Sequence, residues 1–356
     1  MTIGAIYNLT GEQKSLDIPS SQGVELALEK LNATGGVLGR KVLLKLVDGE
    51  TNTDVIARKT QELIDSSTDM PVLIGMSDTD VTLAAAKVAA KNKRLFITSG
   101  ATSPLLPEQV PDYLFLTCYG DNVQAAAAAD YAYSDLKAHT VAVLYKEKMS
   151  YTELLRKYFE EAFKGLGGDV VFSAGYSAQT FADVIKKLPK TEFIYLSASP
   201  DEVISTISAL RAAGHNVPIL SGDGFDIGET WSELPEESNV YFTTHADIGP
   251  GNTDPDVIAF RKAYEKKYPN NEPDAFTALG YDTVMIIAAA VEKAGSLDVD
   301  AIRTALSSLQ NFKGLTGNIS FEKGSYIPIK SVAIFRVDGG AEKDVREILP
   351  MSIPSP

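Results

Sequence analysis

The sequence predicts an α/β protein built as two lobes, each a mainly parallel sheet flanked by helices. Short apolar runs rich in β-branched residues alternate with amphipathic helical patterns, which is typical of a parallel sheet wrapped by helices. The alternation occurs in two series, and the second begins after Gly120. The chain has 356 residues, whereas an ordinary domain holds about 100–150. Length and pattern together therefore predict two lobes.

The first series begins with an apolar run that turns polar at Asn8. Its strands are expected at 3–9, 42–47, 72–76 and 95–98, and its helices at 22–31, 54–64 and 81–91. The runs assigned to strands are short and rich in Val, Ile and Leu, whereas the helical stretches repeat apolar residues every three or four positions.

The second series has a similar build without residue-level repetition. Its strands are expected at 141–145, 170–172, 193–196, 219–220 and 240–243, and its helices at 122–136, 152–166 and 202–213.

The pattern changes after Asp247. The loop 249–256 is followed by helical stretches at 257–268, 274–294 and 299–309 and by β-like runs at 317–319 and 331–337. So few strands cannot form a third α/β domain, so we expect these elements to add layers to the two lobes. The predicted crossings lie near 117–120, 244–247 and 326–330. The N-terminal lobe is then 1–119 plus 247–327, and the C-terminal lobe is 120–246 plus 328–356. Three crossovers predict a hinge beside a cleft that closes around a small ligand.

Composition excludes several classes of function. The formal net charge of −14 opposes binding to nucleic acid, which requires clustered Lys and Arg. No apolar run reaches the roughly 18 residues of a membrane span. Cys118 is the only cysteine, so neither an internal disulfide nor a Cys-rich metal site is expected. We predict no metal and no cofactor.

Catalytic signals are also lacking. The segment Gly11-Glu12-Gln13-Lys14-Ser15 contains Lys-Ser but no glycine directly before the lysine, so it is not a phosphate-binding loop. Neither a G-x-S-x-G nor an H-E-x-x-H motif occurs. The three histidines are isolated in sequence and are expected on the surface or in loops, namely His139, His215 and His245. We therefore predict no catalytic residue.

Small polar residues follow two neighbouring strands of the first series. In open parallel sheets, ligands bind beyond the carboxyl ends of the strands. Ser77, Thr79 and Thr102 can donate hydroxyl hydrogen bonds, while Gly100 and Ala101 leave backbone N–H groups accessible. These residues predict a cradle for a carboxylate. The alternative is that the hydroxyls only cap the helices that follow.

The second series offers groups for the opposite charge. Asp223 lies between two glycines after an expected strand and could meet an ammonium group. Tyr151 lies after a strand and at the start of a helix, where its ring could cover a ligand. The alternatives are an ordinary turn residue and a surface tyrosine.

Several segments resemble the branched-chain amino-acid-binding protein family, the type I periplasmic substrate-binding proteins of ABC importers. The most specific is the Gly-Gly-Val-Leu-Gly-Arg block at 35–40. The matching segments, in order, are 8–11, 23–27, 31–42, 47–48, 73–75, 99–102, 222–224 and 280–282. The resemblance covers nearly the whole chain and implies a two-lobe periplasmic-binding-protein type I fold.

The resemblance also implies roles for individual residues. The ligand carboxylate would be bound by the Thr79 hydroxyl, the Ala101 amide and the Thr102 hydroxyl and amide. Residues that would line this site are Ser77, Ser99 and Gly100. Asp223 would pair with the ammonium, and Tyr151 would stack on the ligand.

Departures from the family pattern leave the ligand's side chain open. Leu116 replaces the arginine that usually precedes the first crossover threonine, and Tyr119 adds a ring beside that hinge. Ser199 lies in a segment where leucine-binding members have a pocket tyrosine. Tyr119, Ser199 and Tyr281 complete the expected ligand-binding set.

The implied function is binding of an amino acid, aliphatic or branched-chain, for a membrane permease, by a monomer in the periplasm or outside the cell. The signal peptide is absent from this chain and is expected to have been removed. One alternative is a protein or sensor of the same fold for another small carboxylate, such as an aromatic acid. A second is an enzyme of the doubly wound class.

Overall fold

The computed structural model describes residues 1–322 and 324–356, which form two compact units. The first unit comprises Met1–Tyr119 and Ala246–Lys330. The second comprises Gly120–His245 and Ser331–Pro356. The chain therefore passes from one unit to the other after Tyr119, after His245 and after Lys330.

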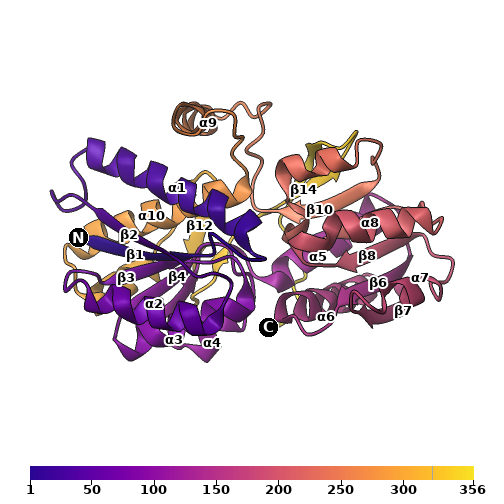
Figure 1. Cartoon of the computed structure of the whole chain (residues 1–356), viewed down its shortest axis with the longest axis horizontal. Coiled ribbons are helices and arrows are strands. Elements are labelled where there is room, and N and C mark those ends of the chain that lie inside the picture. The colour runs from indigo at the N-terminus through magenta and orange to yellow at the C-terminus, as the bar shows by residue number, and fades with distance from the viewer. Residues whose placement is uncertain (323) are drawn as a thin grey trace. The chain divides into compact units, whose positions relative to one another are not determined.

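The first unit is built on a parallel sheet with the strand order β2-β1-β3-β4-β5. Its strands are β1 (Thr2–Tyr7), β2 (Leu43–Asp48), β3 (Val72–Gly75), β4 (Leu95–Thr98) and β5 (Leu114–Leu116). One face is covered by α1 (Lys14–Ala33) and α10 (Ala275–Ala294), and the other by α2 (Thr53–Asp65), α3 (Thr79–Lys91) and the short α4 (Leu106–Gln109) (Figure 1).

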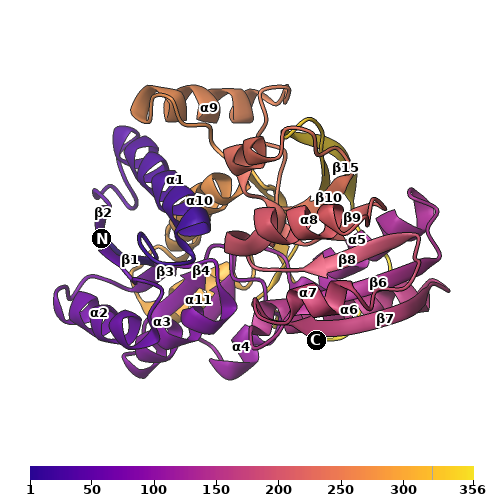
Figure 2. The same cartoon turned by 45° about the vertical axis from the view of Figure 1, so that its right-hand side comes forward.

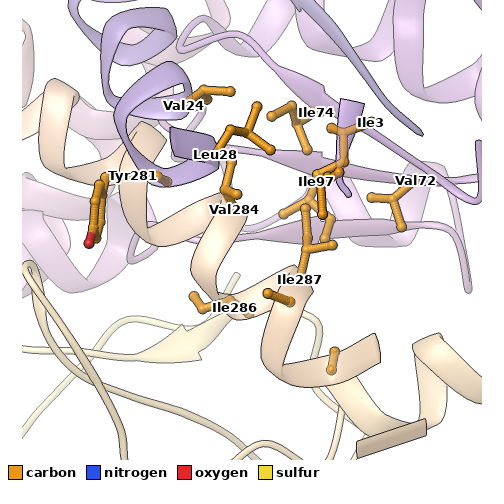
Figure 3. Packing of buried hydrophobic residues seen from close by; sticks show 14 of the residues in the cluster. Ile3, Val24, Leu28, Val72, Ile74, Ile97, Tyr281, Val284, Ile286 and Ile287 are labelled. Carbon is orange, nitrogen blue, oxygen red and sulfur yellow. The ribbon is translucent and has the colours of Figure 1, made fainter. Parts of the chain in front are cut away.

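Alternating strand residues supply the two cores of this unit. Ile3, Ile74 and Ile97 pack toward α1 and α10 (Figure 3), whereas Leu73 and Phe96 belong to the core under α2 and α3. This alternation follows from the two-residue period of a strand, and burial on both faces explains why the strands read as continuous apolar runs.

Helix α1 begins at Lys14, earlier than the predicted start at Gln22. Pro19 lies inside this helix. Because proline lacks an N–H and usually interrupts a helix, the sequence did not predict that the turns before Gln22 are helical. The buried Asp17 anchors those turns, because its Oδ2 accepts hydrogen bonds from the backbone N and the Nδ2 of Asn8, both at 2.8 Å.

The later segment of the first unit adds helices and a small sheet. These elements are α9 (Pro255–Lys267), α11 (Val299–Leu306) and the antiparallel strands β11 (Phe312–Gly314), β12 (Gly317–Phe321) and β13 (Pro328–Ile329). Helix α10 is long and apolar enough to span a membrane, but 83% of its most apolar window is buried inside the protein. It is therefore a core helix of this unit.

The second unit has a seven-stranded sheet with the order β15-β14-β10-β9-β8-β6-β7. Its strands are β6 (Thr140–Lys146), β7 (Asp169–Tyr176), β8 (Phe193–Ser197), β9 (Ile219–Ser221), β10 (Val240–Thr244), β14 (Val332–Val337) and β15 (Glu342–Ile348). Figure 2 shows their succession from β7 to β15. The strands from β6 to β10 are parallel, while β14 is antiparallel to both of its neighbours.

Helices cover both faces of this sheet. α5 (Asp121–Ser134) and α6 (Ser150–Gly165) pack on one face. The other face carries α7 (Phe181–Ile185), α8 (Val203–Ala212) and the 3-10 turns η1 (Pro200–Glu202), η2 (Asp223–Phe225) and η3 (Gly228–Glu233). Two mainly parallel sheets flanked by helices confirm the predicted fold class.

Candidate ligand-binding site

The predicted carboxylate cradle lies at one edge of the first sheet. Gly75 is paired with Ile6 on one side and Thr98 on the other, so the residues that follow β3 and β4 emerge together. This edge lies where the chain order of the strands reverses, between β1 and β3, and such switch points are where open α/β sheets bind ligands.

Two hydroxyls after β3 point to a ligand. Thr79 is 4% exposed, and its Oγ1 has no hydrogen-bond partner within the part of the chain that the structure describes. The Ser77 hydroxyl lies near enough to Asp17 to lower the pKa of that carboxyl, but it is not in hydrogen-bonding geometry with it. Buried polar groups nearly always have a partner, which makes the Thr79 hydroxyl a candidate donor to a ligand.

Several polar groups in the segment after β4 already have hydrogen-bond partners within the protein, which the sequence did not predict. The Ser99 Oγ receives hydrogen bonds from Tyr7 Oη at 3.2 Å and Ser20 Oγ at 3.0 Å. The Gly100 amide donates to the Met76 carbonyl at 3.3 Å, and the Ala101 amide donates to Thr98 Oγ1 at 3.0 Å. These donors bind within the protein, and Thr102, which follows them, is 2% exposed.

Two buried carboxyl groups lie beside the cradle. Burial raises the pKa of Asp17 to about 7 and that of Asp78 to about 6. Asp78 caps α3, since its Oδ1 accepts from the amides of Asp80 at 3.0 Å and Val81 at 3.2 Å. The helix terminus is thus already occupied by an acid, which leaves the hydroxyls as donors for a ligand anion.

Asp223 lies at the corresponding edge of the second sheet. It follows β9 through Gly222 and is 3% exposed. Its Oδ1 accepts hydrogen bonds from Gln124 Nε2 at 2.8 Å and Tyr151 Oη at 2.9 Å. Its Oδ2 lies 2.9 Å from His245 Nε2. The structure therefore brings together Asp223 and Tyr151, two residues predicted for the ligand site.

Tyr151 acts as a neutral hydroxyl in this cluster. Burial, and next the nearby charge of Asp223, raise the pKa of Tyr151 well above its usual value. Its Oη donates to Asp223 and accepts from the Gly224 amide at 3.0 Å. These two hydrogen bonds of the Tyr151 hydroxyl hold its ring beside the Asp223 carboxylate.

Gln124, on α5, links two buried acids. Its Nε2 donates to Asp121 Oδ1 at 3.0 Å and to Asp223 Oδ1 at 2.8 Å. Its Oε1 accepts from the Asp223 amide at 3.1 Å and from Thr243 Oγ1 at 2.7 Å. All four hydrogen-bonding positions of the amide are used, which fixes the orientation of Asp223.

His245 lies in a loop, as predicted, but it is not on the surface. This histidine is 2% exposed, follows β10 directly and pairs with Asp223. His139, by contrast, is exposed and His215 half-buried. The sequence could not reveal the pair, because it depends on β10 lying next to β9, where Phe242 is paired with Ser221.

Comparison with known proteins identifies the family. The model of the periplasmic binding protein family matches residues 1–342. This chain belongs to that family. The Leu/Ile/Val-binding protein homolog 3 of Brucella melitensis is 28% identical over 351 residues, covering 96% of this chain and 92% of the relative. The resemblance predicted from the sequence is confirmed.

Solved structures agree with this assignment. The leucine-binding protein LivK of Thermotoga maritima is 30% identical with a TM-score of 0.86, over 98% of this chain and 99% of that one. LivJ of Streptococcus pneumoniae, a branched-chain amino acid transporter substrate-binding protein solved with isoleucine, is 26% identical with a TM-score of 0.86, over 97% and 99%. Family and fold are those of substrate-binding proteins rather than enzymes, and periplasmic binding proteins of ABC transporters act outside the cytoplasm.

Three residues expected at the ligand of this periplasmic binding protein have other contacts. Tyr281 packs in the core of the first unit, with its ring 5.3 Å from that of Phe260 and directed away from the strand residues Ile74 and Ile97 (Figure 3). Ser199 is the N-cap residue of η1. Its hydroxyl donates a hydrogen bond to Asp201 and accepts one from Lys146 Nζ at 2.6 Å. Tyr119 is fully buried at the end of the first unit.

Phe276 is a cradle residue that the sequence reasoning missed. A Cβ on Gly100 would lie 3.2 Å from the Phe276 ring and 2.8 Å from Ser77 Oγ, so the aromatic edge faces this loop and only glycine fits there. A capping box formed by Asp274 and Thr277 starts α10, so the sequence signals the start of this helix but not the contact of the ring with Gly100. In the described part of the chain, no three His, Cys, Asp or Glu side chains are grouped to hold a metal ion.

Proposed function

We propose that this chain binds a zwitterionic amino acid with an aliphatic, branched side chain and delivers it to the permease of an ABC importer. One observation carries the proposal: among the described residues the buried Thr79 hydroxyl of the first unit has no hydrogen-bond partner, and the second unit offers a buried carboxylate at Asp223. An α-amino acid carries the two groups that complement them.

The carboxylate end would bind in the first unit. A hydroxyl such as that of Thr79 can donate to an anion without introducing a charge that would itself need burial. The bond to a charged acceptor is worth about 1.5–3 kcal/mol. Phe276 beside Gly100 supplies an apolar surface next to this end of the ligand.

The ammonium end would bind at Asp223 in the second unit, with the Tyr151 ring beside it. A buried cation without a partner is costly, so a carboxylate held in place by Gln124 favours a ligand with an amine. The relatives named for leucine, isoleucine and valine support an aliphatic side chain.

The wider assignment follows from the family. We propose that the protein acts as a monomer in the periplasm or outside the cell, with its export signal removed.

Calorimetry with L-leucine, 4-methylpentanoate and leucinamide tests this function. The second compound lacks the amine and the third lacks the carboxylate, so leucine should bind most tightly. Thr79→Val removes the hydroxyl and should weaken leucine and 4-methylpentanoate alike by about 10- to 100-fold. Binding of leucinamide as tight as that of leucine would contradict the cradle.

Thr82→Val is the matched control. Thr82 lies one turn further along α3 and donates to the Asp78 carbonyl at 2.6 Å, so its loss reports the general effect of removing a hydroxyl from this helix. If Thr82→Val weakened leucine as much as Thr79→Val, the loss would reflect helix stability and not a contact with the ligand.

A further inference from the structure

Asp223 already has a partner inside the protein, a histidine that becomes cationic when it is protonated. The His245 side chain is 0% exposed and that of Asp223 is 5% exposed, and Nε2 lies 2.9 Å from Oδ2. The other carboxylate oxygen accepts two hydrogen bonds from neutral donors, Gln124 and Tyr151. An ammonium arriving at Asp223 therefore meets a carboxylate that His245 can neutralise.

We infer that His245, through its own protonation, determines whether this protein binds a zwitterionic amino acid or an anionic acid without an amine. This inference rests on the proposed contact between the ligand's ammonium and Asp223. His245 is a specificity-determining residue that acts through Asp223.

A protonated His245 and a ligand ammonium would compete for the same carboxylate. When His245 is protonated, an ammonium would place a second cation beside one buried carboxylate, and like charges in a site of low polarity repel strongly. Amino-acid binding therefore favours neutral His245, which can still donate from Nε2. A ligand without an amine adds an anion and no cation, so its binding favours protonated His245.

Linkage fixes the direction of the pH dependence. If the amino acid prefers neutral His245, its binding releases a proton and its affinity rises with pH. If the amine-free acid prefers protonated His245, its binding takes up a proton and its affinity falls with pH. Histidine is the side chain whose charge ordinarily changes across neutral pH.

Two further acids belong to the cluster around this pair. On α5, Asp121 is joined to Asp223 through Gln124. After η2, Asp226 accepts a hydrogen bond from Thr244, the neighbour of His245. Tyr151 and Tyr195 remain neutral, because burial raises the pKa of each well above its usual value. Asp121 and Asp226 are present with either ligand, so by themselves they do not distinguish an amino acid from an acid without an amine.

Two ligands with the same side chain separate this effect from other titrations. Asp17 has its pKa raised to about 7 by burial, and burial lowers that of Lys330 to about 8. Both residues belong to the first unit. Since L-leucine and 4-methylpentanoate share the carboxylate, these groups would shift both affinities in the same direction. Only His245 is expected to shift them in opposite directions.

The experiment is calorimetry of the full chain with both compounds at about pH 6 and about pH 8, in buffers of different ionisation enthalpy. For leucine we expect the affinity to rise about 3- to 30-fold with pH, together with proton release. For 4-methylpentanoate we expect a fall and proton uptake. In His245→Gln, which keeps a neutral donor, the opposed trends should disappear, whereas His139→Gln at an exposed site should retain them.

The outcomes are distinguishable. Leucine that binds with the same affinity at both pH values and without proton release overturns the role of His245 while the proposed function stands. Parallel trends for the two compounds, or opposed trends that persist in His245→Gln, overturn it as well. If leucine fails to bind at any pH, the proposed function itself fails. Proton release is measured on the parent protein, so the test remains decisive even if His245→Gln does not fold.

Discussion

The polar clusters of the two units are built in different ways. In the first unit, short polar segments directly after β3 and β4 supply the donors, and the Thr79 hydroxyl has no partner among the described residues. In the second unit, Asp223 is held by Gln124, Tyr151 and His245, which lie 99, 72 and 22 positions away in the sequence. A carboxylate can be bound by local hydroxyls, whereas a buried acid needs partners from several elements to be stable.

The largest effect should come from Asp223→Asn. The substitution keeps the shape but removes the charge that an ammonium would need, a loss of about 3–5 kcal/mol for a buried pair. Leucine binding should weaken by roughly two to four orders of magnitude, measured by calorimetry. The affinity for 4-methylpentanoate should fall much less, which would show that the Asp223 cluster acts on the amine of the ligand and the cradle on its carboxylate. Equal affinity of Asp223→Asn and the parent for leucine would make Asp223 a purely structural residue.

A smaller effect is expected in the stability of the first unit. Burial raises the pKa of Asp17 from 3.8 to about 7, so between these values the folded chain binds a proton that the unfolded chain does not. The free energy of unfolding therefore falls as pH rises through this window, by about 2–4 kcal/mol. The Asp17→Asn side chain keeps an oxygen that can accept hydrogen bonds from Asn8, but it does not ionise. Its free energy of unfolding should therefore not fall in this pH window.

Thermal unfolding at about pH 5 and about pH 8 would measure the effect. The advantage of Asp17→Asn over the parent should grow with pH, whereas Asp65→Asn, at an exposed acid of α2, should show no such trend. A constant difference between Asp17→Asn and the parent would mean that Asp17 ionises without cost and that its burial does not affect the stability of the cradle.

The smallest effect should come from Tyr281→Phe. The ring lies in the core against Phe260, and the substitution retains the ring. Leucine affinity should stay within about twofold and stability within about 0.5 kcal/mol, by calorimetry and thermal unfolding. A large loss of affinity without a loss of stability would return Tyr281 to the ligand site.

The sequence predicted the fold class and the location of the candidate cradle residues at one edge of the first sheet for a common reason. Strands and helices have short periods, and residues after successive parallel strands must meet at one edge. Thr79 and Thr102 could be selected on that basis. The same reasoning could not show that Ser99 is already bonded to Tyr7 and Ser20, because those partners come from another strand and a helix.

By itself, the sequence determined two α/β lobes, the periplasmic binding protein family and the position of Asp223 between two glycines. Only the tertiary structure decided that His245 lies against Asp223, that Gln124 joins this acid to Asp121, and that Tyr281 belongs to the core. The physical reason is that burial and strand order are set by packing over the whole unit. A histidine beside an apolar strand carries no local signal of the acid that will lie 2.9 Å away.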